Sequence, residues 1–133
     1  MTTNEPFWQD ADLIDVYTRA QALADGVLVD ISRLAIEAGF RSPVAVTAAV
    51  WSILNPSDDL ARLGQSATGR AWDVLQVLRA AIGHGDHTDR IHFTPLFVLD
   101  AAHPTPQPVQ LWALCGPGDD EAPVITVMRE GED

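Results

Sequence analysis

The chain has 133 residues, 47% of them apolar, and its 19 acidic residues face 8 basic ones, giving a formal net charge of -11. Phosphate recognition depends on Lys and Arg, so this balance argues against direct nucleic-acid binding, and no run reaches the ~20 apolar residues of a membrane span. A single cysteine excludes an internal disulfide. We therefore expect a cytoplasmic protein that contacts neither nucleic acid nor membrane directly.

The first predicted helix begins after Thr18. Thr18 and Gln21 have the spacing of a capping box, in which each side chain bonds the other residue's backbone N–H. The helix therefore starts at Arg19, and Gly26 ends it because glycine adopts a left-handed conformation without strain. The β-branched segment 27–30 that follows is expected to be extended.

Two further helices follow. Either Asp30 or Ser32 caps the first of them, and Gly39 stops it. The second covers residues 43–54, with Pro43 at its first position, where the missing N–H costs nothing. This segment is apolar on nearly every side, so we expect it to be the buried central helix of the domain.

The clearest amphipathic pattern covers residues 68–82. Its apolar residues follow the three-and-four spacing of one helical face: Ala71, Trp72, Leu75, Leu78 and Ile82. The pattern places Asp73 in the first turn and Arg79 in the last, as the helix dipole favours. A single helical turn is predicted before it, at residues 57–63.

Strand patterns dominate the rest of the chain. Alternating apolar segments occupy residues 91–94 with 96–99, then 109–115, and finally 124–128. Helices first and strands after predict an α+β fold, in which the N-terminal helices pack on one face of a small C-terminal antiparallel sheet of about three strands.

We expect a single domain over residues 1–133, because a chain of this length can bury an adequate core. Residues 1–9 contain Phe7 and Trp8 and are expected to form a loosely attached arm. The acidic residues 129–133 are expected to fray.

No sequence motif identifies an enzyme. The histidine-containing loop 84–89 lacks the i, i+4 spacing of a helical zinc motif, so we expect no metal site there. Cys115 lies in an apolar strand without a neighbouring base, which favours an inert, packed thiol. The GPGDD turn lacks the lysine of a phosphate-binding loop, and no cofactor is expected.

Polar residues next to the apolar segments are the candidate binding residues. They are Tyr17, Arg19, Asp30, Arg41, Trp72, Asp73, Asp119 and Asp120. Structural ion pairs are the simpler interpretation of the charged ones. The alternative is a polar pocket near Tyr17, Arg19, Asp30 and Trp72 that binds a small ligand or serves a small enzyme. Asp119 and Asp120 lie in the hairpin turn, where they are available to a partner.

Four segments resemble recurring blocks of a family of small bacterial proteins carried by plasmids, integrative elements and phages. They are YTRAQALADGVLVDIS, AGFRSPVAVTAAVW, GRAWDVL and CGPGDDEAPVITVM. The resemblance covers most of residues 17–128 and implies a domain of unknown function, with no catalytic residue to transfer. It also implies a mobile genetic element, where accessory proteins often act on host defence or replication.

The acidity and the missing catalytic motifs favour a non-enzymatic protein-interaction module. Such a module binds a basic surface of a host or phage protein, as an anti-defence protein or a nucleic-acid mimic. A negative surface also serves solubility alone. The ligand pocket is the alternative, and the third possibility is a structural subunit whose partner covers Phe7, Trp8, Trp51 or Trp112. Oligomeric state is left open.

Overall fold

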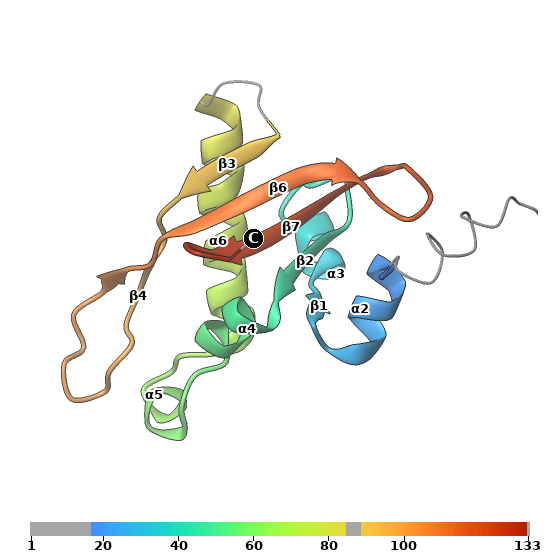
Figure 1. Ribbon diagram of the computed structural model, residues 1–133. Coiled ribbons are helices and arrows are strands. Elements are labelled where there is room, and N and C mark those ends of the chain that lie inside the picture. Colours follow the sequence, from blue (N-terminus) through green and yellow to red (C-terminus); the bar gives the residue numbers. More distant parts are fainter. Residues whose placement is uncertain (1–16, 85–88, 133) are drawn as a thin grey trace, which may run out of the picture.

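The computed structural model describes residues 17–84 and 89–132. Its helices are α2 (Arg19–Asp25), α3 (Ser32–Glu37), α4 (Ala48–Leu54), α5 (Asp58–Arg62) and α6 (Ala67–His84). Its strands are β1 (Leu28–Asp30), β2 (Val44–Thr47), β3 (Arg90–Phe93), β4 (Leu96–Phe97), β5 (Gln107–Pro108), β6 (Leu111–Pro117) and β7 (Pro123–Arg129). The expected α+β class is confirmed (Figure 1). The predicted arm, residues 1–9, lies outside the described residues.

The main sheet is larger than predicted, and it is mixed. In the described part of the chain its five strands lie in the order β1-β2-β7-β6-β3, and β4 pairs with β5 separately. β3, β6 and β7 form the expected antiparallel C-terminal strands. β1 and β2 join them from the N-terminal half, and β2 pairs with β7 in parallel. The prediction of about three antiparallel strands is wrong because it left the N-terminal half out of the sheet.

Residues 43–54 form a strand followed by a helix, not one central helix. The first three residues of β2 are each at most 1% exposed. Thr47 then caps α4, its Oγ1 accepting the N–H of Val50 at 3.2 Å. A strand buried on both faces shows no polar alternation, so its sequence resembles that of a buried helix. The predicted burial of β2 is confirmed, whereas its predicted helical form is wrong.

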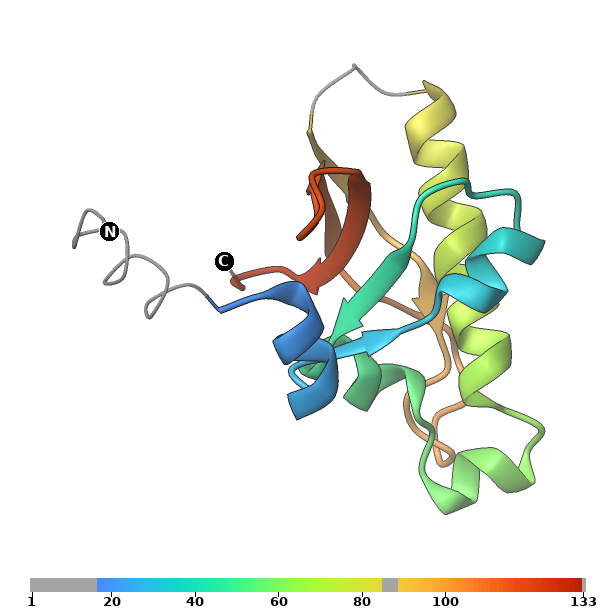
Figure 2. The ribbon, with the colours of Figure 1, turned by 90° about the vertical axis from the view of Figure 1, so that its right-hand side faces the viewer.

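Helices cover both faces of the sheet, not one face as predicted. The main core lies against α3, α4 and α6, and it includes Ile125 and Val127 from β7. Successive side chains of a strand alternate, so Thr126 and Met128 point to the opposite face. α2 packs on that opposite face, where the Arg19 guanidinium donates to Oγ1 of Thr126 at 2.7 Å. Figure 2 shows α2 and α6 on opposite sides of the sheet.

The longest helix, α6, begins inside a segment whose composition is typical of a loop. Ser66 stabilises its first turn by accepting the N–H of Gly69 at 2.9 Å, as serine commonly does at helix starts. Asp73, predicted in the first turn, therefore lies beyond it. The shorter helix α5 confirms the helical turn predicted at residues 57–63.

The buried stripe of α6 differs in part from the predicted stripe. Its buried residues are Arg70, Ala71, Val74, Leu75 and Leu78. Trp72 and Ile82 were predicted to lie on the core face, but they are 37% and 38% exposed. At about 100° per residue, Trp72 lies about 120° around the helix from Leu78, the middle of the buried stripe, and Ile82 lies near the C-terminal end of the helix.

The local signals at both ends of α2 are confirmed. The Thr18 N–H donates to Oε1 of Gln21 at 2.8 Å, and the Gln21 N–H donates to Oγ1 of Thr18 at 3.0 Å. Gly26 takes the left-handed conformation at the end of α2, with φ 79°.

The predicted capping of α3 by Asp30 or Ser32 is wrong, because Ile31 occupies the N-cap position and no side chain caps the helix. Asp30 instead accepts the N–H of Ser32 at 3.0 Å just before the helix.

The C-terminal segment is tied down as far as residue 132, although it was expected to fray. Oε2 of Glu132 accepts the Thr47 hydroxyl at 2.8 Å and the N–H of Arg129 at 2.7 Å. The N–H of Glu130 donates to the carbonyl of Gln110 at 3.1 Å. These contacts hold the last described residues against β2 and β6.

Candidate functional site

Two adjoining hollows open on the sheet face that carries α2. Their volumes are about 590 and 560 Å³. Shared lining residues join them into one continuous surface: Tyr17, Ala22, Leu28, Leu114 and Thr126. We call this surface the α2 groove.

The floor of the α2 groove follows from strand alternation. Pairing places Leu28 of β1 beside Thr47, and Leu114 of β6 beside Thr126. Met128 lines the same surface further along β7. Because α2 has seven residues, it shields only part of this face. Leu28 is therefore half-buried and Leu114 is 36% exposed, and the floor is both apolar and accessible.

Arg19 fastens α2 to the sheet. Its guanidinium donates to Oγ1 of Thr126 at 2.7 Å and to the carbonyl oxygen of Ile125 at 2.9 Å. Burial lowers the pKa of Arg19, while the nearby carboxylates of Asp30 and Asp119 oppose that shift. The guanidinium of Arg19 thus serves to hold α2 on the sheet.

Asp119, in the hairpin between β6 and β7, caps α2 from a distant part of the chain. Its two carboxylate oxygens accept the N–H groups of Arg19 at 2.8 Å and Ala20 at 2.9 Å. Thr18 accepts the next N–H, that of Gln21, so the first orphan donors of α2 are satisfied. These backbone hydrogen bonds lower the pKa of Asp119 below its usual 3.8, and nearby Arg19 adds to the effect.

We expect the cap to make stability depend on pH. A depressed folded-state pKa means that the stabilisation is complete above 3.8 and is lost as pH falls through the lower folded value. Asp119→Asn keeps an acceptor and removes the charge, so it lowers the melting temperature by a few degrees at neutral pH. This difference from the wild type should shrink between about pH 5 and about pH 2.

Thermal melts followed by circular dichroism measure the effect of the cap. Asp120→Asn is the matched control, because Asp120 accepts the N–H of Ala122 at 3.1 Å within the turn. A difference between Asp119→Asn and the wild type that stays constant across this pH range would contradict the cap's electrostatic role.

Carboxylates border the α2 groove at both ends. Asp89 and Asp119 line one hollow, and Asp25 and Glu132 line the other. The Tyr17 hydroxyl donates to Oδ2 of Asp25 at 2.7 Å, and this hydrogen bond raises the pKa of Tyr17. Among the described lining residues, Arg19 supplies the one guanidinium. The groove therefore combines an apolar floor with a net negative border.

The β3 side of the same sheet face is covered by polar side chains. The Arg90 guanidinium lies 4.2 Å from the ring centre of Trp112. His92 stacks on Trp112 with 6.5 Å between the ring centres, and its Nδ1 lies 3.8 Å from Oε2 of Glu130. Trp112 is buried on this face, although the predicted alternation of β6 turns it away from the core.

The predicted candidate residues occupy separate places. Tyr17, Arg19 and Asp119 line the α2 groove. Asp30 borders a hollow between α3, α4 and α6, Trp72 and Asp73 border another at the start of α6, and Arg41 and Asp120 are exposed. Of the four residues of the predicted pocket, Tyr17 and Arg19 line the α2 groove, and Asp30 lies near enough to Arg19 to affect its pKa. Trp72 lies on α6, across the sheet from Tyr17 and Arg19, so the four do not converge.

Other residues of the groove were not anticipated. Leu28, Leu114 and Met128 look like ordinary strand residues in the sequence. Their cross-strand neighbours are known only once β1, β2, β7 and β6 are placed in register. Asp25 and Glu132 likewise meet only through the tertiary fold.

The remaining reactive groups form no site in the described residues. Burial, together with nearby Asp89, raises the pKa of the half-buried Cys115, so its thiol is protonated at neutral pH. Within residues 17–84 and 89–132, no three histidine, cysteine or acidic side chains could hold a metal ion. Most of the histidine-containing loop 84–89 lies outside the described part. His103 pairs with Asp100, its Nδ1 3.0 Å from Oδ2.

The fold and groove define a class of protein: an α+β domain with a mixed five-stranded sheet, one face of which is only partly covered by a helix. In the described ranges no helix is both long and apolar enough to cross a membrane. The chain belongs to a family of unknown function (DUF6573), whose sequence profile matches residues 4–133. No curated protein and no solved structure matches the chain. The resemblance to a domain of unknown function is confirmed at this level.

Proposed function

We propose that the protein is a non-enzymatic interaction module that binds a basic partner protein. The supporting observation is that three arginines give their guanidinium hydrogen bonds to groups within the fold, although of these three only Arg70 is buried. Arg70 is 3% exposed and donates to the backbone carbonyls of Ile53, at 2.6 Å, and Val98. Arg79 donates to the carbonyl of Ala38 at 2.9 Å, and Arg19 is tied to the sheet as described above.

The negative charges lie at the surface. Every described Asp and Glu side chain is exposed except Glu132, which is half-buried. The guanidinium groups of Arg19, Arg70 and Arg79 hydrogen-bond to backbone carbonyls and to Thr126, although Asp30 and Asp119 also lie near Arg19. An acidic surface of this kind attracts basic partners and accelerates their association.

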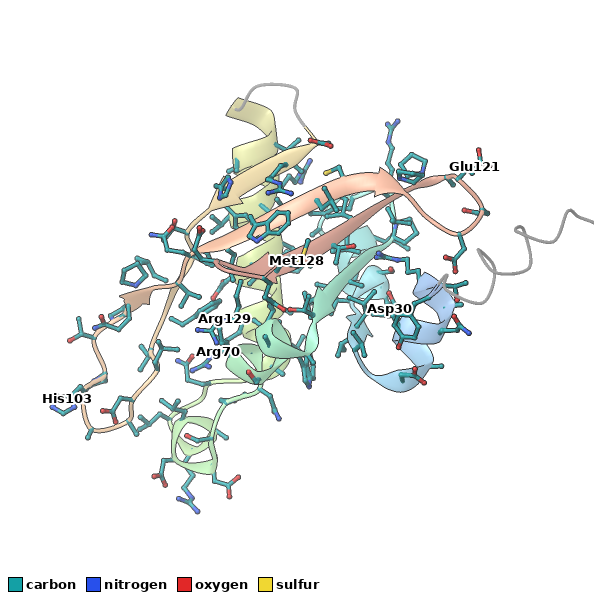
Figure 3. The ribbon with its side chains drawn as sticks, viewed as in Figure 1. Asp30, Arg70, His103, Glu121, Met128 and Arg129 are labelled. Atoms are coloured by element: carbon teal, nitrogen blue, oxygen red, sulfur yellow. The ribbon has the colours of Figure 1, made fainter. Side chains whose placement is uncertain are left out.

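The arrangement supports a general acidic module more than a nucleic-acid mimic. A mimic requires carboxylates spaced like phosphates along one face. Here the described carboxylates are spread over distant elements, including α5, α6 and both long connections between strands. Figure 3 shows Glu121 of the β6–β7 hairpin and His103, the partner of Asp100, at opposite ends of the molecule.

The cellular setting is part of the proposal. The resemblance to proteins of plasmids, integrative elements and phages supports a role within a mobile genetic element, where a basic host or phage protein is the target. The single, half-buried Cys115 is compatible with the reducing cytoplasm. The ligand-pocket alternative is not favoured, because its four residues do not converge.

The test is affinity purification of the full chain from its native host at two salt concentrations. We expect basic proteins to be retained at about 0.05 M salt and released at about 0.5 M, since the screening length shortens severalfold. The main partner, once purified, should show the same salt dependence in a direct binding measurement. Salt-insensitive binding, or no retained basic protein, contradicts the proposal.

A further inference from the structure

We infer that the α2 groove is the docking site for a cationic amphipathic helix of the partner protein. This inference rests on the proposed function and adds to it a site and a partner chemistry. Three properties of the groove carry it: an apolar floor, a negative border, and space on the sheet for one more helix.

The floor supplies the apolar half of the match. Leu28 and Leu114 lie at the junction of the two hollows, and Met128 extends the floor along β7. Val27 and Tyr17, at 50% and 53% exposed, extend it at the rim. Exposed apolar side chains that gather on one surface are typical of a protein interface, whereas isolated ones are common everywhere.

The border supplies the charge. Carboxylates of Asp89 and Asp119 stand at one end of the groove, and those of Asp25 and Glu132 stand at the other. Asp25 and Asp119 accept hydrogen bonds from neutral donors, which do not cancel the carboxylate charge. Arg19 lies near Asp119, but it is the one guanidinium among the four carboxylates of the described lining residues. A segment with an apolar face and flanking Lys or Arg side chains complements this surface, and an acidic segment is repelled.

The dimensions favour a helix. Strands lie about 4.8 Å apart, so a five-stranded sheet is roughly 20 Å wide, and one helix about 10 Å in diameter covers about half of it. In the described residues α2 covers the β1 side of this face, while Arg90 and His92 cover Trp112 on the β3 side. An amphipathic helix laid between them buries the floor, as in other helix-in-groove complexes.

The probe is a synthetic peptide of about 18 residues, about five helical turns, with Leu and Lys at helical spacing. The control is a peptide of the same composition, shuffled so that it has no apolar face. Binding to the full chain is measured by titration calorimetry at low salt. We expect the amphipathic peptide to bind at least about tenfold more tightly than the shuffled one, because only it can bury the floor.

The decisive variant is Leu114→Glu, which removes an apolar side chain from the floor of the groove and adds a negative charge. We expect it to weaken binding about tenfold, because a buried carboxylate replaces an apolar contact. Leu96→Glu is the matched control, since Leu96 is 59% exposed on β4 and lies outside the groove. It should leave binding unchanged or strengthen it. Val27→Glu repeats the test if Leu114→Glu fails to fold in a thermal melt.

The outcomes separate this inference from the proposed function. If Leu114→Glu and Leu96→Glu both strengthen peptide binding, the overall negative charge of the protein attracts the peptide. The inference that the α2 groove is the docking site is then wrong, whereas the proposed acidic interaction module is still supported. Equal affinity for the amphipathic and shuffled peptides would also contradict docking in the α2 groove without contradicting the proposed function. If neither the peptide nor any basic protein binds at low salt, the proposed function fails too.

Discussion

Replacing Arg70 by alanine should lower the free energy of unfolding by about 3 kcal/mol, because it removes donors from buried carbonyl groups and opens a cavity. The guanidinium donates to the carbonyls of Ile53 and Val98, which link the end of α4 to the segment after β4. It also lies 5.6 Å from the ring centre of Phe97. Burial lowers the pKa of Arg70, and the hydrogen bonds to the two carbonyl groups offset part of the cost of burying its charge.

Urea denaturation measures this change. Arg70→Lys should recover part of the loss, because an ammonium group cannot reproduce the planar fork of a guanidinium. Arg62→Ala is the control: Arg62 pairs with Asp59 at 2.7 Å on the exposed surface, and such pairs contribute less than about 1 kcal/mol. If Arg70→Ala proved as mild as Arg62→Ala, the buried guanidinium would not be the link between these segments.

The second large effect is expected at Leu78, which is fully buried in α6. Leu78→Ala should cost about 3 kcal/mol, because it removes apolar contacts and leaves a cavity in a close-packed core. Ile82→Ala, one turn later, should cost less than about 1 kcal/mol, since Ile82 is 38% exposed.

The Leu78 and Ile82 variants test the position of the buried stripe. The sequence pattern predicts that both residues are buried, whereas in the structure Leu78 is fully buried and Ile82, on the same face near the end of the helix, is 38% exposed. Equal losses of stability in urea denaturation would support the sequence pattern over the observed packing.

Local chemistry explains which elements could be predicted. The capping box of Thr18 and Gln21 and the left-handed Gly26 involve residues a few positions apart, so the start and end of α2 were correct. The positions of β6 and β7 were also predicted from their alternating pattern. These two strands pair with each other across a short turn, so their pairing is local in the sequence. The limits of α2 and these strand assignments follow directly from the sequence.

The parts that were missed depend on contacts between distant segments. The apolar run in β2 is compatible with strand and helix, and its pairing with β1 and β7 decides between them. The position of α2 on the second face depends on Arg19 meeting Thr126 and on Asp119 capping the helix. Of the candidate binding residues, Tyr17, Arg19 and Asp119 share a surface, whereas Trp72 lies on α6, across the sheet from them.

The parallel pairing of β2 with β7 has a consequence for synthesis of the chain. β7 is synthesised after all the other described strands, and β2 has been made long before it. Until β7 emerges, one edge of β2 has no strand to pair with, and the sheet exists only as separate fragments. The sheet therefore cannot be completed until β7 has been made, and shortening the chain before β7 would leave β1 and β2 detached from β6 and β3.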